Sequence, residues 1–321
     1  MDEIKAFPNF ESAANSYLEF LRSKYGFDLC MVTRKSGDDW IVLQAADSRY
    51  GVETGHVFCW SDSICSQMVR NNGPRIVPRL ADVPAYMEAP IARQLKVGAY
   101  LGIPLVRHDG SMFGTLCGMH PEALDPKVEK DAPVIEMLTR SLCTLLDYDL
   151  RMTDRLRQLD RVSNQAMTDE LTGLYNRRGW NELMQAEENR CSAYGHPAVA
   201  FSIDLDSLKE VNDHLGHTAG DELLQRTARV LQSTIRQQDF AARISGDEFA
   251  LLVTECRCED AVDMKSRLEA ALEEARVQAS VGFGVRDPRH GLRHAWQRAD
   301  EAMYCAKRIR KQPHGVCAAG Q

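Results

Sequence analysis

The fold of this chain is decided by two stretches, FSIDLDSLKEVNDHLGHTAGDELL at residues 201–224 and ARISGDEFALLV at residues 242–253. Each stretch places carboxylates where a predicted strand ends: Asp204 and Asp206 in the first, Asp247 in the second. Carboxylates at neighbouring strand ends are the oxygen ligands with which proteins hold Mg²⁺ against the phosphates of a nucleotide. The pattern therefore indicates an enzyme of phosphoryl or nucleotidyl transfer.

Asp204 alone would have a simpler explanation. A helix is predicted to follow it at once, and an acid at that place is typical of a helix N-cap. Asp247, which arrives from another strand, makes the metal site the better interpretation.

The composition is that of a soluble globular protein. The chain has 321 residues, 44% of them hydrophobic and 26% charged, which is enough for two domains. The formal net charge of −7 leaves no excess of cations for a nucleic-acid backbone and argues against a general nucleic-acid binder. We expect the ten cysteines to be mostly reduced core residues. Cys256 and Cys258 lack the second pair or the histidine that a zinc site needs.

The sequence shows no targeting or membrane segment. Its first residues, MDEIKAFPNF, are acidic and lack the apolar segment of a signal peptide. No apolar run approaches the roughly 20 residues that span a bilayer. We therefore expect a cytoplasmic protein without a membrane partner.

Residues 1–125 are predicted to form an α+β sensor domain on an antiparallel sheet. Apolar residues at helical spacing indicate a helix over residues 10–25. Residues 27–47 predict two strands around a Ser-Gly-Asp-Asp turn, and residues 100–120 repeat this pattern around a His-Asp-Gly-Ser turn.

Residues 126–168 are predicted to form a linker helix, because they contain no Gly and have Pro only near their start. Apolar residues recur there on alternating three- and four-residue steps, a heptad seam that predicts a coiled coil between two chains. The alternative is one amphipathic helix packed on its own domain. Asp149 and Ser163 interrupt the seam. Its apolar members are Ile135, Leu138, Leu142, Leu145, Met152, Leu156, Leu159 and Ala166.

Residues 169–315 are predicted to form an α/β domain, because strands and amphipathic helices alternate there. The predicted strands are residues 198–206, 240–244, 248–253 and 277–285.

The first part of the chain resembles a GAF domain over roughly residues 10–150. The strand GIPL, a polar turn, the strand FGTLCGM and a long helix after it carry the resemblance. A PAS-type domain, which also places helices on an antiparallel sheet, is the alternative. The resemblance implies a sensor of an unknown small-molecule or redox signal. We expect Cys59, Cys65 and Cys117 to be buried reduced thiols rather than redox or chromophore sites.

The second part resembles a GGDEF domain, the catalytic module of diguanylate cyclases. Four motifs occur in the family's order, and such agreement makes a chance match very improbable. They are DELTGLYNRR at residues 169–178, the metal and base motif from Asp204 to Asp221, the SGDEF signature at residues 245–249 and ADEAMYCAK at residues 299–307. The resemblance implies a polymerase-palm or ferredoxin-like central sheet surrounded by helices.

The resemblance also implies the metal site. Asp204 would bind Mg²⁺ through its carboxylate, Leu205 through its backbone carbonyl, and Asp247 would complete the site. Two Mg²⁺ ions per active site, or Mn²⁺ instead, would orient an in-line displacement. Asp247 would help to deprotonate the attacking 3′-hydroxyl, with Glu248 as a second acid and Lys209 as a further catalytic residue.

Asn212 and Asp221 are implied to select guanine, since Asp221 can accept from the N1 and N2 protons that adenine lacks. Gly246 would let the backbone approach the substrate. The alternative for the lysines is a solvated helix face. The other implied substrate contacts, at the base and the phosphates, are Leu174, Leu208, Ser207, Lys307 and Lys311.

The chain departs from the family pattern at two places. Ser245 stands where the family usually has Gly, and a positive φ there would cost about 1–2 kcal/mol. Because Ser is small and its hydroxyl can compensate, we expect activity to survive. After Lys307, Arg310 replaces a Gly, and Lys311 stands where a phosphate-binding Arg is expected, which keeps the charge but loses the bidentate fork.

Arg236 and Asp239 precede the signature at the spacing of the family's inhibitory RxxD site, where product binds. Arg236 would grip guanine or phosphate, and Asp239 would accept from guanine. A lone RxxD is otherwise typical of a helix-end ion pair.

The expected reaction is 2 GTP → cyclic di-GMP + 2 pyrophosphate, inhibited by its product. Two such domains must face each other, so we expect a homodimer whose sensor domains control how often the half-sites meet. One alternative is a catalytically degenerate receptor of cyclic di-GMP, favoured only by Ser245. Another is a different polymerase-palm nucleotidyltransferase, for which the acidic chain lacks a basic groove.

Overall fold

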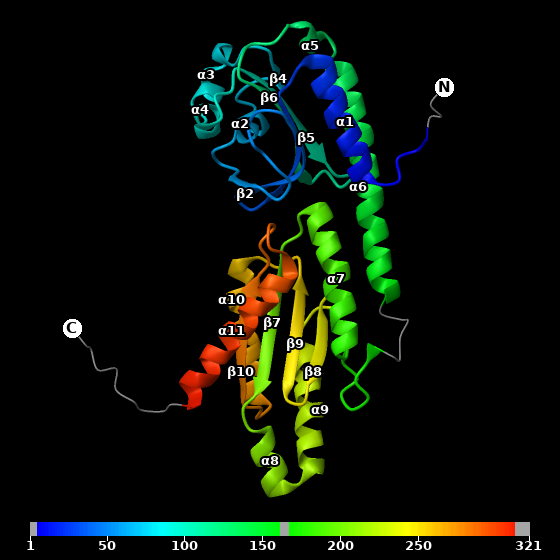
Figure 1. Cartoon of the computed structure of the whole chain (residues 1–321), viewed down its shortest axis with the longest axis vertical. Helices are drawn as coiled ribbons and strands as arrows, with labels where there is room; N and C mark the ends of the chain where they lie inside the picture. The colour runs from blue at the N-terminus through cyan, green and yellow to red at the C-terminus, as the bar shows by residue number, and fades with distance from the viewer. Residues whose placement is uncertain (1–4, 161–166, 312–321) are drawn as a thin grey trace, which may run out of the picture. The chain divides into compact units, whose positions relative to one another are not determined.

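The computed structural model describes residues 5–160 and 167–311, with the side chains of residues 156–160 and 311 left out. These residues form two compact units (Figure 1). The first consists of the residues up to 158 together with residues 192–195, and the second of the other residues from 159 on. No helix in the described part of the chain is both long and apolar enough to cross a membrane.

The first unit is built on a six-stranded antiparallel sheet. Its strand order is β3-β2-β1-β6-β5-β4, so the two predicted hairpins, β1-β2 and β5-β6, are joined through β1 and β6. Both hairpin turns carry Gly at positive φ, 64° at Gly37 and 82° at Gly110. The strands are β1 (Leu29–Ser36), β2 (Asp39–Asp47), β3 (Val57–Cys59), β4 (Ile76–Val77), β5 (Ala99–Val106) and β6 (Met112–His120).

The two faces of this sheet carry two separate cores. Because strand side chains alternate, Cys30 and Val32 of β1 join the core beneath α1 and α6, while Leu29 and Met31 join the core beneath α2, α3 and α4. α1 begins at an N-cap, where the Asn9 side chain accepts a 2.8 Å hydrogen bond from the Ser12 amide. The helices are α1 (Phe10–Tyr25), α2 (Ile64–Val69), α3 (Pro84–Met87), α4 (Pro90–Gln94), α5 (Lys127–Lys130) and α6 (Ala132–Asp160), with a 3₁₀ turn at Leu80–Asp82.

The predicted heptad seam is only partly free for a second chain. Ile135 and Leu142 are buried in the core of the first unit, together with Leu146 and Leu150, because α1 covers that face of α6. For these residues the alternative of a helix packed on its own domain is correct. Asp149, expected to interrupt the seam, accepts a 2.6 Å hydrogen bond from the amide of Phe10 at the start of α1.

The rest of the seam lies outside this core contact. Leu138 and Leu145 are half-buried at its edge, and Met152 is exposed. The side chains of Leu156 and Leu159, and all of Ser163 and Ala166, lie outside the described residues. The coiled coil between two chains stays a prediction.

The second unit has a ferredoxin-like sheet, as predicted. Four antiparallel strands follow the order β10-β7-β9-β8, with α7 and α11 on one face and α9 and α10 on the other (Figure 1). The strands are β7 (Ala198–Leu205), β8 (Phe240–Ser245), β9 (Glu248–Thr254) and β10 (Ala279–Val285). The helices are α7 (Arg177–Tyr194), α8 (Leu208–Leu215), α9 (His217–Thr234), α10 (Cys258–Glu274) and α11 (Gly291–Lys311).

Helix α11 lies directly against the backbone of β10. A Cβ atom at Gly282 would come within 2.2 Å of the Ala299 carbonyl oxygen and the Met303 amide nitrogen, and one at Gly284 within 2.0 Å of the Ala295 carbonyl oxygen. Only glycine permits this approach. The close packing brings the last turns of α11 to the end of β7, where the predicted carboxylates are.

Candidate functional site

The predicted acids converge where β7 ends and β9 begins. Asp204 pairs with Glu248 across the two strands, and the Leu205 amide donates a 3.0 Å hydrogen bond to the Asp247 carbonyl oxygen. The turn between β8 and β9 therefore lies directly beside the last residues of β7. The structure thus brings together Asp204, Leu205 and Asp247, which are far apart in the sequence.

Asp204 is 7% exposed and makes an ion pair with α11. Lys307 Nζ lies 2.5 Å from its Oδ1 atom. Burial raises the pKa of Asp204, and the negative charges of Asp247 and Asp206 raise it further, although Lys307 acts in the opposite sense. Asp204 is paired with Lys307 and Asp206 with Arg310, so Asp247 gives this group of three acids and two cations an excess of negative charge, which a divalent cation would relieve.

Lys307 keeps its positive charge in this ion pair. Burial by itself would lower the pKa of Lys307, but the hydrogen bond to Asp204 and the nearby acids raise it. Lys307 is therefore charged at neutral pH and points into the acid site rather than lying on a solvated helix face.

The oxygen donors suit a hard cation. Two carboxylates and the Leu205 carbonyl are the ligand types that Mg²⁺ and Mn²⁺ take. Among the described residues, no three side chains of His, Cys, Asp or Glu gather into a metal site. The site as predicted relies on two side chains and one backbone carbonyl, so substrate phosphates and water would have to supply the remaining oxygens.

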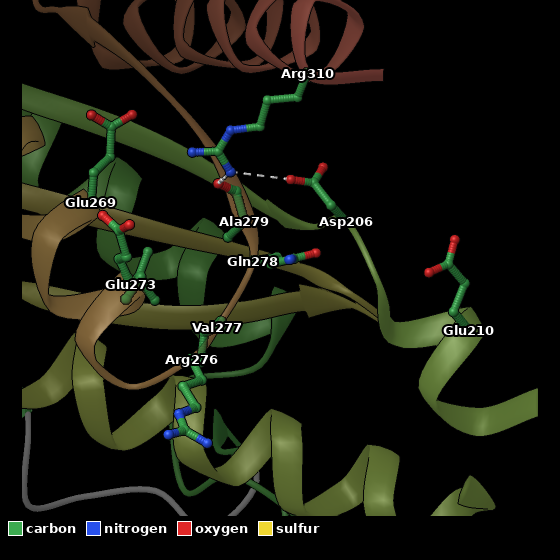
Figure 2. A pocket seen from close by; sticks show the side chains of 10 residues that line it. Asp206, Glu210, Glu269, Glu273, Arg276, Val277, Gln278, Ala279 and Arg310 are labelled. Atoms are coloured by element: carbon green, nitrogen blue, oxygen red, sulfur yellow. Dashed lines mark hydrogen bonds and ion pairs between the residues drawn. The ribbon is translucent and has the colours of Figure 1, made fainter. Parts of the chain in front are cut away.

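Asp206 has a different set of partners. Its carboxylate accepts from Ser280 Oγ at 3.0 and 3.2 Å and from Arg310 Nη1 at 3.3 Å. The same Nη1 atom donates to the carbonyl oxygen of Ala279 (Figure 2). Arg310, which replaces a family glycine, thus ties the end of α11 to the start of β10 and pairs with Asp206.

A cleft of about 900 Å³ opens beyond Asp206 (Figure 2). Its lining carries four acids but only two arginines, Arg276 and Arg310, and of the strand-end carboxylates predicted from the sequence it includes only Asp206. This excess of negative charge does not suit a triphosphate. The four acids are Asp206, Glu210, Glu269 and Glu273.

The signature turn is not strained at Ser245. Neither Ser245 nor Gly246 has a positive φ, so the predicted cost of 1–2 kcal/mol does not arise. Ser245 Oγ instead donates a 2.6 Å hydrogen bond to Glu248 Oε2. A Cβ at Gly246 would meet no atom within 4 Å, so the turn has an open side from which a ligand could approach.

Arg243, which the sequence analysis missed, holds this turn. Its Nε and Nη2 atoms donate to the Gly246 carbonyl oxygen at 3.1 and 2.9 Å, and its Nη1 atom lies 3.3 Å from both carboxylate oxygens of Asp169. Asp169 also accepts from the Thr172 amide and hydroxyl at 2.9 and 2.6 Å. The entry motif therefore supports the signature turn. The position of Arg243 three residues before Gly246 is the sequence signal that could have identified it.

The predicted guanine contacts lie on the α8–α9 hairpin. α8 ends at Gly216, whose φ of 84° reverses the chain, and a Cβ at Gly220 would lie 1.9 Å from Asn212 Oδ1. Gly220 thus makes room for the Asn212 amide beside the exposed Asp221.

The remaining predicted contacts divide into core and surface. Leu174 and Leu208 are buried in the core of the second unit, in the same cluster as Leu205 of the site. Ser207 precedes α8 without capping it. Lys209 is exposed and has no ion-pair partner among the described residues. The side chain of Lys311 lies outside them.

The predicted inhibitory pair is a capped turn rather than a helix-end ion pair. Asp239, 7% exposed, accepts from the Arg236 amide at 2.9 Å and from the Thr254 amide at 3.0 Å. Its carboxylate therefore holds the turn to the end of β9, while the Arg236 side chain is exposed. A second cation lies close by, since Arg267 Nη2 donates to the Thr234 carbonyl oxygen at 3.2 Å.

Comparison with known proteins finds a family match for each of the two parts of the chain. Residues 166–313 match the family "Diguanylate cyclase, GGDEF domain", and residues 9–146 match the GAF domain family rather than a PAS domain. The probable diguanylate cyclase DgcC of Escherichia coli K12 is 31% identical over 177 residues, which are 52% of this chain and 47% of that protein. The response regulator PleD of Caulobacter vibrioides is 34% identical over 170 residues, 49% of this chain and 37% of that protein.

This chain thus spans less than half the length of these two relatives. Among solved structures, the GGDEF domain of DgcB from Caulobacter crescentus in complex with c-di-GMP is 25% identical. The alignment covers 46% of this chain and 93% of that one, with a TM-score of 0.43.

Proposed function

We propose that this chain, which contains a GAF domain at residues 9–146 and a GGDEF domain at residues 166–313, is a diguanylate cyclase that condenses two GTP into cyclic di-GMP and two pyrophosphates. The observation that carries the proposal is the convergence of Asp204, Asp247 and Lys307 at one end of the sheet. The curated relatives named as diguanylate cyclases support it.

In this proposal the carboxylates of Asp204 and Asp247 and the carbonyl of Leu205 hold Mg²⁺ or Mn²⁺, which would neutralise charge that develops on the phosphates. Lys307, the charged lysine nearest the acids, contacts the triphosphate. Asp247 accepts the proton of the 3′-hydroxyl as that oxygen attacks the α-phosphorus of the second GTP and pyrophosphate leaves. The 3′-hydroxyl of the second GTP then attacks the α-phosphorus of the first in the same way, which closes the ring and releases the second pyrophosphate.

Guanine selection is assigned to Asn212 and Asp221. The exposed Asp221 carboxylate can accept from N1 and N2 of guanine, and the Asn212 amide beside it can both donate and accept. The receptor alternative rested on strain at Ser245, and Ser245 has no positive φ, so no observation favours that alternative.

A homodimer follows from the chemistry, because each active site activates one GTP. An apolar groove between α1 and α6, with a volume of about 330 Å³, supports it. The seam residues Leu138 and Leu145 line this groove beside Phe7 and Phe20, which are 49% and 36% exposed. We assign the groove to a second copy of the chain, whose seam would bury these side chains. The GAF domain would then control how often the two half-sites meet.

The test is product formation by the purified chain. With GTP and Mg²⁺ it should yield cyclic di-GMP and pyrophosphate in a 1:2 ratio, measured by chromatography and mass spectrometry. Asp247→Asn should lower the rate at least about 100-fold, whereas Asp263→Asn, at an exposed position on α10, should leave it unchanged. No product from GTP, or a different product from mixed nucleoside triphosphates, would reject the proposal.

A further inference from the structure

Two buried cysteines of the first unit lie side by side. Cys65 is the second residue of α2 and Cys117 lies on β6, and both are fully buried. Their sulfur atoms are 3.0 Å apart. A disulfide bond measures 2.03–2.05 Å, so the two sulfurs would have to approach by about 1 Å to be joined.

The pair belongs to a polar cluster inside an otherwise apolar core. The Tyr100 hydroxyl donates to Cys65 Sγ at 3.1 Å, and Thr115 Oγ1 lies 3.5 Å from Cys65 Sγ and 3.1 Å from Cys117 Sγ. The Thr33 hydroxyl donates a 2.9 Å hydrogen bond to the carbonyl oxygen of Thr115. The donors are therefore arranged around sulfur rather than paired only with one another.

This arrangement makes the two thiols unequal. Burial works to raise the pKa of Cys65, but hydrogen bonds from Cys117, Thr115 and Tyr100 outweigh it and lower the pKa. Burial and the neighbouring Cys65 raise the pKa of Cys117. Of the two thiols, Cys65 is thus the more acidic. Such a division suits a nucleophilic and a resolving thiol.

We propose that Cys65 and Cys117 form a reversible intramolecular disulfide, so that the GAF domain senses two-electron oxidants such as hydrogen peroxide. The Cys65 thiolate attacks one peroxide oxygen and the O–O bond breaks. This leaves a sulfenic acid and hydroxide, which takes up the proton that Cys65 released. Cys117 then attacks the Cys65 sulfur and the S–O bond breaks, with loss of a second water. Two thiols and one peroxide give one disulfide and two waters.

Cys30 shows what an ordinary core thiol looks like in the same unit. It is fully buried in the core on the opposite face of the sheet, and burial raises its pKa. Cys30 therefore serves as the matched control. Since Cys65 and Cys117 have no exposed surface, the oxidant must be small, whereas bulky thiol reagents should reach only exposed thiols such as Cys59, Cys258 and Cys305. The exposure of Cys59 also corrects the prediction that it is buried.

The experiment treats the full reduced chain with hydrogen peroxide, alkylates the remaining thiols under denaturing conditions and maps the peptides by mass spectrometry. The peptides of Cys65 and Cys117 should be joined, with a mass two hydrogens lower, and dithiothreitol should separate them. This measurement needs no variant and no catalysis, so it stands apart from the cyclase assay. Separate alkylation of both cysteines after exposure to peroxide would overturn the proposal.

Variants then assign the roles. In Cys117→Ser, Cys65 should stop at the sulfenic acid and be trapped by dimedone added under denaturing conditions, whereas in Cys65→Ser the Cys117 thiol should stay reduced. Cys30→Ser should form the bond like the natural chain. Sulfenic acid appearing on Cys117 instead, or equal loss of both thiols in all variants, would refute the assignment.

The sensing role has its own readout. Trp40 Nε1 donates to Thr33 Oγ1 at 2.7 Å and to Thr115 Oγ1, which contacts both sulfurs, at 3.3 Å, so bond formation should change tryptophan fluorescence. The rate of cyclic di-GMP synthesis should change with it in the natural chain and not in Cys117→Ser. If the bond forms while both fluorescence and rate stay constant, sensing is refuted.

Discussion

The backbone amide of Leu205 donates a 3.0 Å hydrogen bond to the carbonyl oxygen of Asp247. This bond joins the end of β7 to the signature turn, so the distance between the two segments that we propose to bind metal depends on backbone geometry. The turn is in turn held by Arg243 through the Gly246 carbonyl. The precision of the site therefore depends on residues that need not touch the substrate.

The first prediction concerns Arg243, whose side chain is only 16% exposed. Arg243→Gln removes the hydrogen bonds to Gly246 and the ion pair with Asp169, and we expect a loss of about 1.5–3 kcal/mol in the free energy of unfolding. The kcat should fall by a larger factor than the KM for GTP rises, because the turn carries Asp247. Arg178→Gln, which breaks an exposed ion pair with Glu182, is the control. An unchanged kcat and KM in Arg243→Gln would show that the turn keeps its conformation without the Arg243 contacts.

The second prediction is a pH dependence of stability at Asp169. Burial works to raise its pKa, but hydrogen bonds from Thr172 and the charge of Arg243 outweigh it, so the pKa is lowered in the folded state. A depressed carboxyl pKa stabilises the fold above the unfolded value of about 3.9 and loses that effect as pH falls through the folded pKa.

Urea unfolding at pH 7 and at pH 3 measures this effect. Asp169→Asn should be less stable than the natural chain at pH 7, and the difference should shrink at pH 3. Asp263→Asn, at an exposed position, should follow the natural chain at both values. An equal difference in the free energy of unfolding at the two pH values would mean that Asp169 stabilises the fold through packing and neutral hydrogen bonds and not through its charge.

The third prediction concerns the contact between α11 and β10. A Cβ at residue 282 would meet the α11 backbone at 2.2 Å, so Gly282→Ala must push α11 outward, at a cost of about 1–3 kcal/mol in stability. Lys307 moves with the helix, and the KM for GTP should rise several-fold. Ala302→Ser on the exposed face of α11 should change neither quantity. A normal KM in a destabilised Gly282→Ala protein would separate the helix contact from substrate binding.

The fourth prediction tests the dimer. Leu145→Asp places a charge in the groove between α1 and α6 and should shift the chain from dimer to monomer in sedimentation equilibrium, with loss of cyclase activity. Met137→Asp changes a residue of the same helix that is 60% exposed and outside the groove, and it should stay dimeric. Circular dichroism must show that both variants are folded. A dimeric Leu145→Asp protein would place the interface elsewhere.

The sequence predicted the elements that have local signals. The turns at Gly37 and Gly110, the helix over residues 10–25 and the four strands of the second unit lie where pattern and turn residues placed them. Of the heptad seam, Ile135 and Leu142 pack in the core of their own unit, because a 3.5-residue repeat cannot show which partner covers it. The coiled coil between two chains stays a prediction. That Asp204 and Asp247 converge was inferred from their places at two predicted strand ends and from the family motifs together, since no local signal brings two distant strand ends together.

Other features depend on side-chain contacts that no spacing rule contains. The link between Arg243 and Asp169 spans 74 residues, and the pairing of Cys65 with Cys117 spans 52. The positive φ considered for Ser245 does not occur, and the turn is held by hydrogen bonds from Arg243 and from the Leu205 amide.

The last prediction concerns product inhibition. The carboxylate of Asp239 is already held by the amides of Arg236 and Thr254, whereas the guanidinium of Arg236 is exposed, so Arg236 should supply most of the affinity for product. Arg236→Ala should raise steady-state cyclic di-GMP output several-fold without changing the initial rate. Arg229→Ala, at an exposed position on α9, should leave inhibition intact. Asp239→Asn should instead lower stability, because its carboxylate holds the turn to β9. If added cyclic di-GMP inhibits Arg236→Ala as strongly as the natural chain, the inhibitory site lies elsewhere.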